Sequence, residues 1–400
     1  MVVGPYAPRM EPFFEDEHDE FRRAVRTFIE REVLPHLTAW DEAHLVDREF
    51  FRKAGAAGLL GTAVPEEYGG GGVDDFRFNM IIGEEFARVG ASGAGLSLTL
   101  HNDIVQPYLL HYANDEQKAR WLPGFVSGDI VTAIGMTEPD AGSDVAGIKT
   151  SAVRASAPAD DHYVVNGAKT FITNGIHADL VITAVKTDPK ERHRGISLLG
   201  IERGMEGFSR PRKLDKIGLD SQDTAELLFE DVQVPVANLL GNEGEGFGCL
   251  MRNLAQERLS VAVWAIPAAQ YAVDLTVDHC NNRMAFGEPL SRLQNTRFVL
   301  AELQTEISVG RAFVQECVRE LNAGVLTAEK AAMAKWWTTE MHQRCVDRCL
   351  QLHGGYGYMR EYPIARAYLD TRVTTIYAGT TEIMKEIIGR AVVGGTLPSP

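Results

Sequence analysis

The stretch MTEPDAGSDVAGIKT, residues 136–150, joins two parts of the chain that have different sequence patterns. It is rich in Thr, Ser, Asp and Gly, which favour turns and let the backbone approach a ligand closely. The pattern before it is typical of helices, and the pattern after it is typical of strands. An ordinary polar connection has the same composition, so these residues alone leave open whether the stretch binds a ligand.

Helices are expected before this stretch, from about residue 17 to residue 128. Residues 20–37 place apolar side chains at the spacing of one helical face, and Pro35 ends that helix. The face consists of Phe21, Val25, Phe28, Ile29 and Val33. Residues 90–100 are rich in small side chains, which let helices pack closely or border a cavity.

Strands are expected after the stretch. Asn166-Gly167 and Asn174-Gly175 are typical of hairpin turns and bracket the segment AKTFIT. Residues 179–187, 195–202 and 225–235 have the pattern of further strands. The middle of the chain therefore predicts a small antiparallel β domain.

From about Gly246 the pattern is helical again, with a long helix that contains Pro267. Residues 298–321 carry apolar side chains at the spacing of a helical bundle. The sequence thus predicts an α+β protein in three domains: a helical domain at 12–130, a β domain at 131–240 and a helical bundle at 241–400.

The chain has 400 residues, of which 45% are hydrophobic and 24% charged, with a formal net charge of −15. This composition is that of a globular protein, and the negative charge argues against a broad surface for nucleic acid. We find no apolar run long enough to span a bilayer, and the acidic N-terminus lacks a signal peptide's apolar core. We therefore expect a cytoplasmic protein without a membrane span.

The five cysteines form no CxxC pair, so neither a disulfide framework nor a zinc ribbon is expected. His342, Cys345 and Cys349 fall near one face of an expected helix, where a metal site is conceivable. Buried structural cysteine is commoner than a metal ligand, so no metal is expected.

Glu257 and Arg258 interrupt the apolar segment LAQERLSVA. Val261, Trp264 and Ala268 share the helical face of Glu257, which indicates a carboxylate in a dry pocket. There its pKa would rise and the group could act as a base. The alternative is that Glu257 lies on the solvent face beside Arg258.

The stretch IYAGTTEIMKEIIGRA, residues 376–391, combines a tight turn at Ala378-Gly379 with a helix start. Thr380 is an expected N-cap, and Glu382 suits the positive first turn of the helix. Free backbone N–H groups at such a place can bind an anion, a phosphate or a polarised carbonyl.

Other stretches carry weaker signals. Thr173 could donate a hydrogen bond to a heteroaromatic ring against which Phe171 lies, and Arg283 could bind phosphates. An exposed threonine before a turn and an exposed arginine are the alternatives. Gly354 and Gly355 follow a helix, where glycine is the ordinary C-cap.

Together and in this order, five stretches resemble the acyl-CoA dehydrogenase family. They are MTEPDAGSDVAGIKT at 136–150, FITNG at 171–175, RMAFG at 283–287, QLHGGYGYMREYPIARAYLDTRV at 351–373 and IYAGTTEIMKEII at 376–388. The resemblance runs from about Phe21 to Arg390.

The resemblance implies an N-terminal helical domain, a middle antiparallel β-barrel-like domain and a C-terminal four-helix bundle, in a homotetramer with one non-covalent FAD per subunit. It also implies the α,β-desaturation of an acyl-CoA thioester. In that reaction a carboxylate takes the α-proton while the β-hydrogen leaves as hydride to flavin N5. The implied electron acceptor is electron-transferring flavoprotein.

The resemblance also implies which residues bind FAD. Thr137 and Thr173 correspond to hydroxyls that hydrogen-bond the flavin ring, and Phe171 to the aromatic residue against it. The adenine and pyrophosphate end is implied to lie largely across a subunit interface. The whole set is Thr137, Gly142, Ser143, Phe171, Thr173, Arg283, Phe286, Gln294, Gln351, Gly354, Gly355, Thr380 and Glu382.

The base departs from the commonest family pattern, because Ala378 stands where many members carry glutamate. The long-chain branch has its base in a QER context, as at Gln256-Glu257-Arg258, so the resemblance assigns the base to Glu257. The backbone N–H of Ala378 is expected to polarise the thioester carbonyl. The implied substrate contacts are Ser143, Arg258, Tyr377, Ala378 and Gly379.

Two other functions remain open. One is a different flavoenzyme on the same scaffold, such as an acyl-CoA oxidase, a nitroalkane oxidase or a monooxygenase. The other is a non-catalytic paralogue that binds FAD or acyl-CoA, which the missing glutamate at Ala378 suggests. The small residues at 90–100 suggest room for a long or branched acyl chain, and leucine at Ala94 or Gly95 is expected to shorten the accepted chain.

Overall fold

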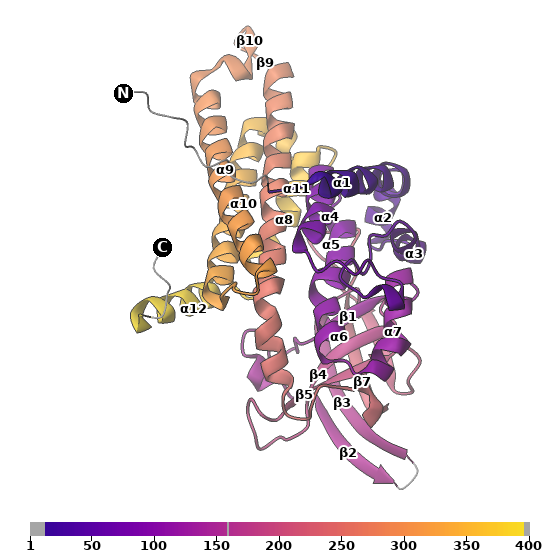
Figure 1. Ribbon diagram of the computed structural model, residues 1–400. Helices are drawn as coiled ribbons and strands as arrows, with labels where there is room; N and C mark the ends of the chain where they lie inside the picture. The colour runs from indigo at the N-terminus through magenta and orange to yellow at the C-terminus, as the bar shows by residue number, and fades with distance from the viewer. Residues whose placement is uncertain (1–12, 158–159, 396–400) are drawn as a thin grey trace, which may run out of the picture.

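The computed structural model describes residues 13–157 and 160–395, which form a helical part, a sheet and a second helical part in chain order (Figure 1). The predicted α–β–α order is therefore confirmed. The expected outer domain limits, residues 12 and 400, lie outside the described residues.

Seven α-helices form the N-terminal part: α1 (Asp16–Phe28), α2 (Leu37–Ala43), α3 (Arg48–Ala56), α4 (Phe76–Arg88), α5 (Ser92–Thr99), α6 (Gln106–Tyr112) and α7 (Asp115–Ser127). A π-helical segment, Ile29–Val33, continues α1, and another, Leu100–Val105, joins α5 to α6. The predicted apolar face of α1 is buried in the core of this part, where Phe21 packs against it from the rim.

The sheet has eight strands: β1 (Thr132–Gly135), β2 (Ser151–Ala157), β3 (Asp160–Thr173), β4 (Leu180–Lys186), β5 (Ile196–Glu202), β6 (Phe208–Lys213), β7 (Thr224–Pro235) and β8 (Leu239–Leu240). Their hydrogen-bonded order is β6-β7-β3-β2-β4-β5-β8, with β1 beside β4. The expected antiparallel pairing holds for most neighbours. It fails at β4, which pairs in parallel with β1 and, at one residue, with β2.

The prediction of a hairpin turn at Asn166-Gly167 is wrong. Both residues lie inside β3, where the register against β7 shifts between Val165 and Gly167. A Cβ on Gly167 would come within 2.7 Å of the Thr150 backbone, so glycine is needed here for a close approach within the sheet. The prediction of a turn at Asn174-Gly175 is confirmed, because β3 ends at Thr173 and Asn174 has φ 59°.

The C-terminal part is built on three long helices, α8 (Gly246–Asn282), α9 (Gln294–Asn322) and α10 (Ala328–His353), which stand side by side (Figure 1). A short hairpin, β9 (Met284–Ala285) and β10 (Glu288–Pro289), links α8 to α9. Two further helices, α11 (Pro363–Thr371) and α12 (Thr381–Gly394), pack against α10. The central place of α10 brings residues from α8 and from the turn before α12 to the same helix.

Helix α8 is long and apolar enough to cross a bilayer, contrary to the expectation from the sequence. In this structure 67% of the relevant window is buried inside the protein. The apolar composition is therefore explained by contacts with α4, α9 and α10, as in the core helix of a soluble protein.

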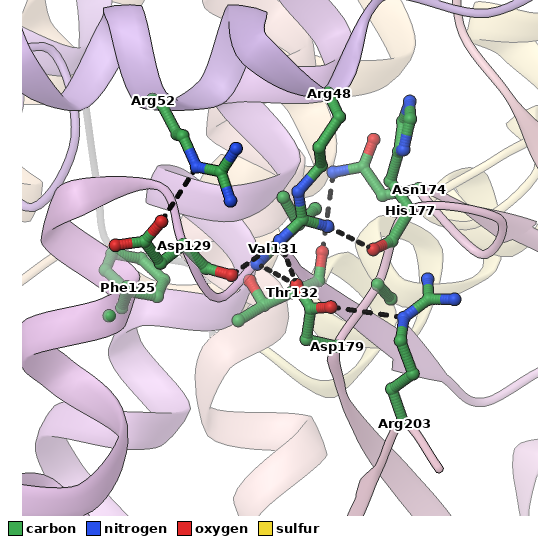
Figure 2. A network of polar contacts seen from close by, with 12 residues as sticks. Arg48, Arg52, Phe125, Asp129, Val131, Thr132, Asn174, His177, Asp179 and Arg203 are labelled. Atoms are coloured by element: carbon green, nitrogen blue, oxygen red, sulfur yellow. Dashed lines mark hydrogen bonds and ion pairs between the residues drawn. The ribbon is translucent and has the colours of Figure 1, made fainter.

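A polar network fastens the N-terminal helices to the sheet (Figure 2). The guanidinium of Arg48 on α3 donates to the carbonyl oxygens of Asp129, at 2.5 Å, and His177, at 2.6 Å. It also pairs with Asp179, whose carboxylate accepts from the Val131 N–H at 2.8 Å and pairs with Arg203. Residues from both sides of the domain junction thus share one carboxylate.

Candidate active site

The turn before α12 has an unusual backbone. Ala378 has φ 53° and Gly379 has φ 99°, and the non-glycine Ala378 is therefore strained. Among the described residues, no hydrogen bond is formed by the Ala378 N–H. The turn thus presents a free donor, as the sequence suggested.

The start of α12 is capped as predicted. The Thr380 hydroxyl accepts from the N–H of Ile383 at 3.4 Å. The pKa of Glu382 is lowered by a hydrogen bond from its own backbone N–H and by another from the Thr380 hydroxyl. This helix start therefore already stabilises one carboxylate, which agrees with its positive end.

Glu257 is buried on α8, with 4% of its surface exposed. Burial raises its pKa to about 7, against the opposing effects of a hydrogen bond from Tyr108 and the charge of Arg258. The Tyr108 hydroxyl donates to Glu257 Oε1 at 2.8 Å, across 149 residues of sequence. The alternative that places Glu257 on the solvent face is wrong, and the group has the pKa of a base working near neutral pH.

A second buried carboxylate, Asp103, fixes this part of α8. Its two oxygens accept from Asn79 Nδ2 at 2.7 Å and Ser260 Oγ at 2.5 Å, and its carbonyl accepts from Gln256 Nε2 at 2.8 Å. Burial raises the pKa of Asp103 to about 6. Gln256 and Ser260, on either side of Glu257, are thereby tied to the segment that follows α5 and, through Asp103, to α4.

Two buried cations lie near the turn before α12. Arg258, next to Glu257, is 6% exposed, and its Nε has no partner among the described residues. Lys335 on α10 is fully buried and donates to the Gly379 carbonyl at 2.7 Å. The role of Arg258 as a substrate contact stays a prediction.

A cavity of 480 Å³ lies between the N-terminal helices, α8 and α11. Trp264 and Ala268 line it from the helical face that also carries Glu257, and Tyr377 lines it beside the turn. Glu257 and Ala378 do not line it themselves. The lining is Leu37, Thr38, Ala87, Val89, Gly90, Ser92, Leu96, Leu219, Trp264, Ala268, Tyr271, His342, Arg360, Glu361, Pro363, Arg366, Ala367, Asp370, Thr374 and Tyr377.

The small residues at 90–100 border this cavity, but at other positions than expected. The small residues Gly90 and Ser92 line it, together with Leu96, whereas Ala94 packs in the core of the N-terminal helices. A Cβ at Gly95 would lie 2.4 Å from the Trp264 ring, so Gly95 acts on the cavity through that side chain.

The stretch 136–150, expected between the helices and the first strand, instead connects β1 to β2 and is held from inside by Glu138. Its carboxylate accepts from the N–H groups of Lys149, at 2.6 Å, and Thr150, at 2.9 Å, and from Lys169 Nζ at 2.8 Å. Burial lowers the pKa of Lys169 to about 8 although Glu138 opposes this shift. An ordinary polar connection needs no such buried anchor, so the stretch has a fixed shape.

Thr137 and the end of β3 come together. The Thr137 carbonyl accepts from the Thr170 N–H at 2.9 Å. Phe171 has φ 59° and is 68% exposed, at a register shift between Lys169 and Ile172. Strained backbone conformations cluster at active and binding sites, so Phe171 is a candidate contact for a ligand. Gly142 and Ser143 are exposed on the neighbouring loop.

A second hollow lies where α8 ends and α10 ends. Its lining includes Arg283, Gln351, Gly354 and Gly355, which the structure therefore brings together. A Cβ on either glycine would meet open space. Phe286, 96% exposed on the β9–β10 hairpin, and Gln294, the first residue of α9, lie outside that lining.

The side chains considered for a metal have other partners. His342 Nδ1 hydrogen-bonds the Thr371 hydroxyl at 2.9 Å, and Cys345 contacts the Ala269 carbonyl at 3.6 Å. Across residues 13–157 and 160–395 no three His, Cys, Asp or Glu side chains form a group that could hold a metal ion.

The sequence did not single out three buried residues of this region, Tyr108, Asp103 and Lys335. Each forms a hydrogen bond with a distant segment, and no local pattern signals such a contact. Of the three, only Lys335 has a signal in the sequence, because it is a single charged residue in an otherwise apolar segment of α10.

Three family models match most of the chain. The acyl-CoA dehydrogenase N-terminal domain matches residues 15–129, the middle domain residues 133–232 and the C-terminal domain residues 244–393. These ranges follow the helical, sheet and helical parts of the structure.

Individual relatives agree with the models. The chain is 46% identical over 382 residues to the mitochondrial long-chain specific acyl-CoA dehydrogenase of Mus musculus, covering 95% of this chain and 87% of that one. It matches the crystal structure of acyl-CoA dehydrogenase from Geobacillus kaustophilus with a TM-score of 0.91, 50% identity and coverage of 96% and 100%. Glutaryl-CoA dehydrogenase from Mycobacterium smegmatis, in complex with FADH2, is 26% identical with a TM-score of 0.88 and coverage of 98% for both chains. The chain therefore belongs to the acyl-CoA dehydrogenase family of flavin-dependent oxidoreductases.

Proposed function

We propose that this protein is an FAD-dependent dehydrogenase that converts a long-chain or branched acyl-CoA to the trans-2-enoyl-CoA, with Glu257 as the base. The observation that carries this proposal is the buried carboxylate of Glu257, with a pKa of about 7, on the helix whose next turns line an acyl-sized cavity. An acyl-CoA oxidase would need the same base, so the fate of the reduced flavin, rather than Glu257, separates the two activities.

The proposed proton transfer uses groups of this chain. Glu257 takes the α-proton of the thioester while the Tyr108 hydroxyl stabilises its ionised form. The free N–H of Ala378 donates to the thioester carbonyl oxygen and makes the α-carbon more acidic. Water is excluded because Glu257 and Tyr108 are both buried.

The residues fit FAD in three respects. The strained, exposed Phe171 and the adjacent Thr137 and Thr173 suit a flat heteroaromatic ring. The hollow at Arg283 and Gln351 suits a charged nucleotide end, and the missing side chains of its two glycines leave space. The remaining proposed contacts are Gly142, Ser143, Phe286, Gln294, Thr380 and Glu382. When bound, FAD supplies the acceptor for the β-hydrogen as hydride.

The acyl chain is proposed to occupy the 480 Å³ cavity. Each methylene removed from water contributes about 0.8 kcal/mol to binding, so the fit of the chain decides substrate preference. The lining includes the exposed residues Thr38, Arg360 and Glu361, so the cavity reaches the surface of the chain and leaves room for a long tail.

Electron-transferring flavoprotein as the electron acceptor, assembly into a homotetramer and a cytoplasmic location stay proposals. The name of the murine relative supports the long-chain substrate class and gives a mitochondrial location for that protein.

The deciding experiment is the anaerobic addition of saturated acyl-CoAs of increasing chain length to the FAD-loaded protein. We expect the flavin absorbance to bleach, most rapidly with long or branched chains. Glu257→Gln should keep FAD and lose bleaching, and full bleaching in that variant would overturn the assignment of the base. Rapid reoxidation by oxygen with peroxide release would favour an oxidase, and tight binding without bleaching at any chain length would favour a non-catalytic paralogue.

A further inference from the structure

Lys335 is a buried lysine with one hydrogen-bond partner. Its side chain is 0% exposed, and Nζ donates to the Gly379 carbonyl at 2.7 Å, a residue 44 positions away. Among the described residues, Nζ forms no other hydrogen bond. Burying an ammonium, which has three donors, destabilises the fold unless the donors are paired or the charge has a function. A single hydrogen bond therefore does not by itself explain why Lys335 is buried.

The bond holds one end of the turn that presents the Ala378 N–H. The Gly379 carbonyl belongs to the planar Gly379–Thr380 peptide unit, so Lys335 orients the unit that closes the turn, two units after the one that carries the Ala378 N–H. Ala378, at φ 53°, and Gly379, at φ 99°, have left-handed conformations, and for an alanine this persists only where its surroundings hold it. Lys335 on α10 contributes to this restraint through its hydrogen bond to the Gly379 carbonyl.

Lys335 also brings charge to the turn. The charged groups that act on it are Arg258 from α8, Glu340 from α10 and Glu382 from α12. Burial, followed by the charge of Arg258, lowers the pKa of Lys335 to about 8, so the ammonium is mostly charged at pH 7. Two buried cations, Arg258 and Lys335, therefore lie close to the turn.

We propose that Lys335 is a positioning residue for α-proton removal, which fixes the Ala378–Gly379 turn and places positive charge where the thioester oxygen becomes negative. The inference rests on the proposed function, because it requires the thioester to lie at this turn. When Glu257 takes the α-proton, the electron pair of the C–H bond moves toward the thioester oxygen, and a nearby ammonium stabilises that charge.

The test measures the acidity of a bound β-keto acyl-CoA, such as acetoacetyl-CoA. Its enolate, bound beside oxidised flavin, gives a long-wavelength absorbance band, so the pH at which the band is half-formed reports the stabilisation of negative charge. Lys335→Gln keeps a donor but loses the charge, and Lys335→Met loses both. We expect the midpoint to rise by about one pH unit in the glutamine variant and by more in the methionine variant, since one unit is a tenfold change in ionisation.

Lys330→Met is the matched control, because Lys330 lies on the same helix and pairs with Glu320 away from the turn. Its midpoint should equal that of the wild type. An unchanged midpoint in Lys335→Gln would show that the charge of Lys335 does not stabilise the enolate. An unchanged midpoint in both variants would overturn the whole proposal. If the wild-type protein itself forms no enolate band at any pH, the proposed function fails, and this inference fails with it.

Discussion

Replacing Tyr108 by phenylalanine tests how the buried carboxylate is tuned. The Tyr108 hydroxyl donates to Glu257 at 2.8 Å. Among the described residues, no other group donates a hydrogen bond to this carboxylate. Without it the ionised form loses a hydrogen bond to a charged group, which contributes about 1.5–3 kcal/mol. This corresponds to about 1–2 pKa units. The Glu257 pKa should therefore rise from about 7 to about 8–9.

The sign follows from the role of the group as a base. A raised pKa leaves Glu257 protonated at neutral pH, so activity is lost there and recovered as the pH rises. At pH 7 the ionised fraction should fall from about one half to between a tenth and a hundredth, which lowers the rate about 5- to 50-fold. Near pH 10 the variant should approach the wild-type rate.

The assay is the rate of anaerobic flavin reduction against pH, with a saturated acyl-CoA in excess. Tyr112→Phe is the matched control, since that hydroxyl accepts from Arg252 and has no bond to Glu257. An unchanged midpoint in Tyr108→Phe would refute the reasoning. So would a rate that stays low at every pH in a variant that still binds FAD, because the hydroxyl would then have a role other than setting this pKa.

Two further changes have expected outcomes. Gly95→Ala places a Cβ 2.4 Å from the Trp264 ring, so we expect the indole to move and the flavin-reduction profile to shift toward shorter acyl chains; an unchanged profile would count against Gly95 shaping the cavity. Glu138→Gln leaves Lys169 buried without its charge partner, which typically costs about 3–5 kcal/mol. A lowered midpoint in urea unfolding and weaker FAD binding should follow, and wild-type stability would refute the anchoring role of this pair.

The pattern of the sequence was sufficient for the order of the three parts and for individual local features. The cap at Thr380 and the buried face of α1 follow from rules that act within a few residues, and both are confirmed. Glu257 was placed in a dry pocket because three apolar residues share its helical face. Local spacing was enough there, since α8 is one continuous helix.

The sequence did not predict contacts between segments that are far apart in the chain. Asn166-Gly167 has the composition of a turn, yet it lies within a strand because its glycine lets the Thr150 backbone approach. The partner of Glu257 is 149 residues away, and no periodicity predicts which tyrosine will face it. The composition of α8 could not distinguish a helix buried in protein from one buried in lipid, since both environments select the same residues.

The way Asp103 joins the helices bears on how a substrate enters. It connects α4 and α8, which both border the 480 Å³ cavity, while Arg48 fastens α3 to the sheet at the other side of the N-terminal helices. Hinge motions of whole domains take microseconds to milliseconds and need a junction that can open. Here Asp103 and Arg48 bond these elements together, and the exposed Arg360 and Glu361 line the cavity. We therefore expect access to the cavity through picosecond to nanosecond motion of such side chains rather than through opening of whole domains.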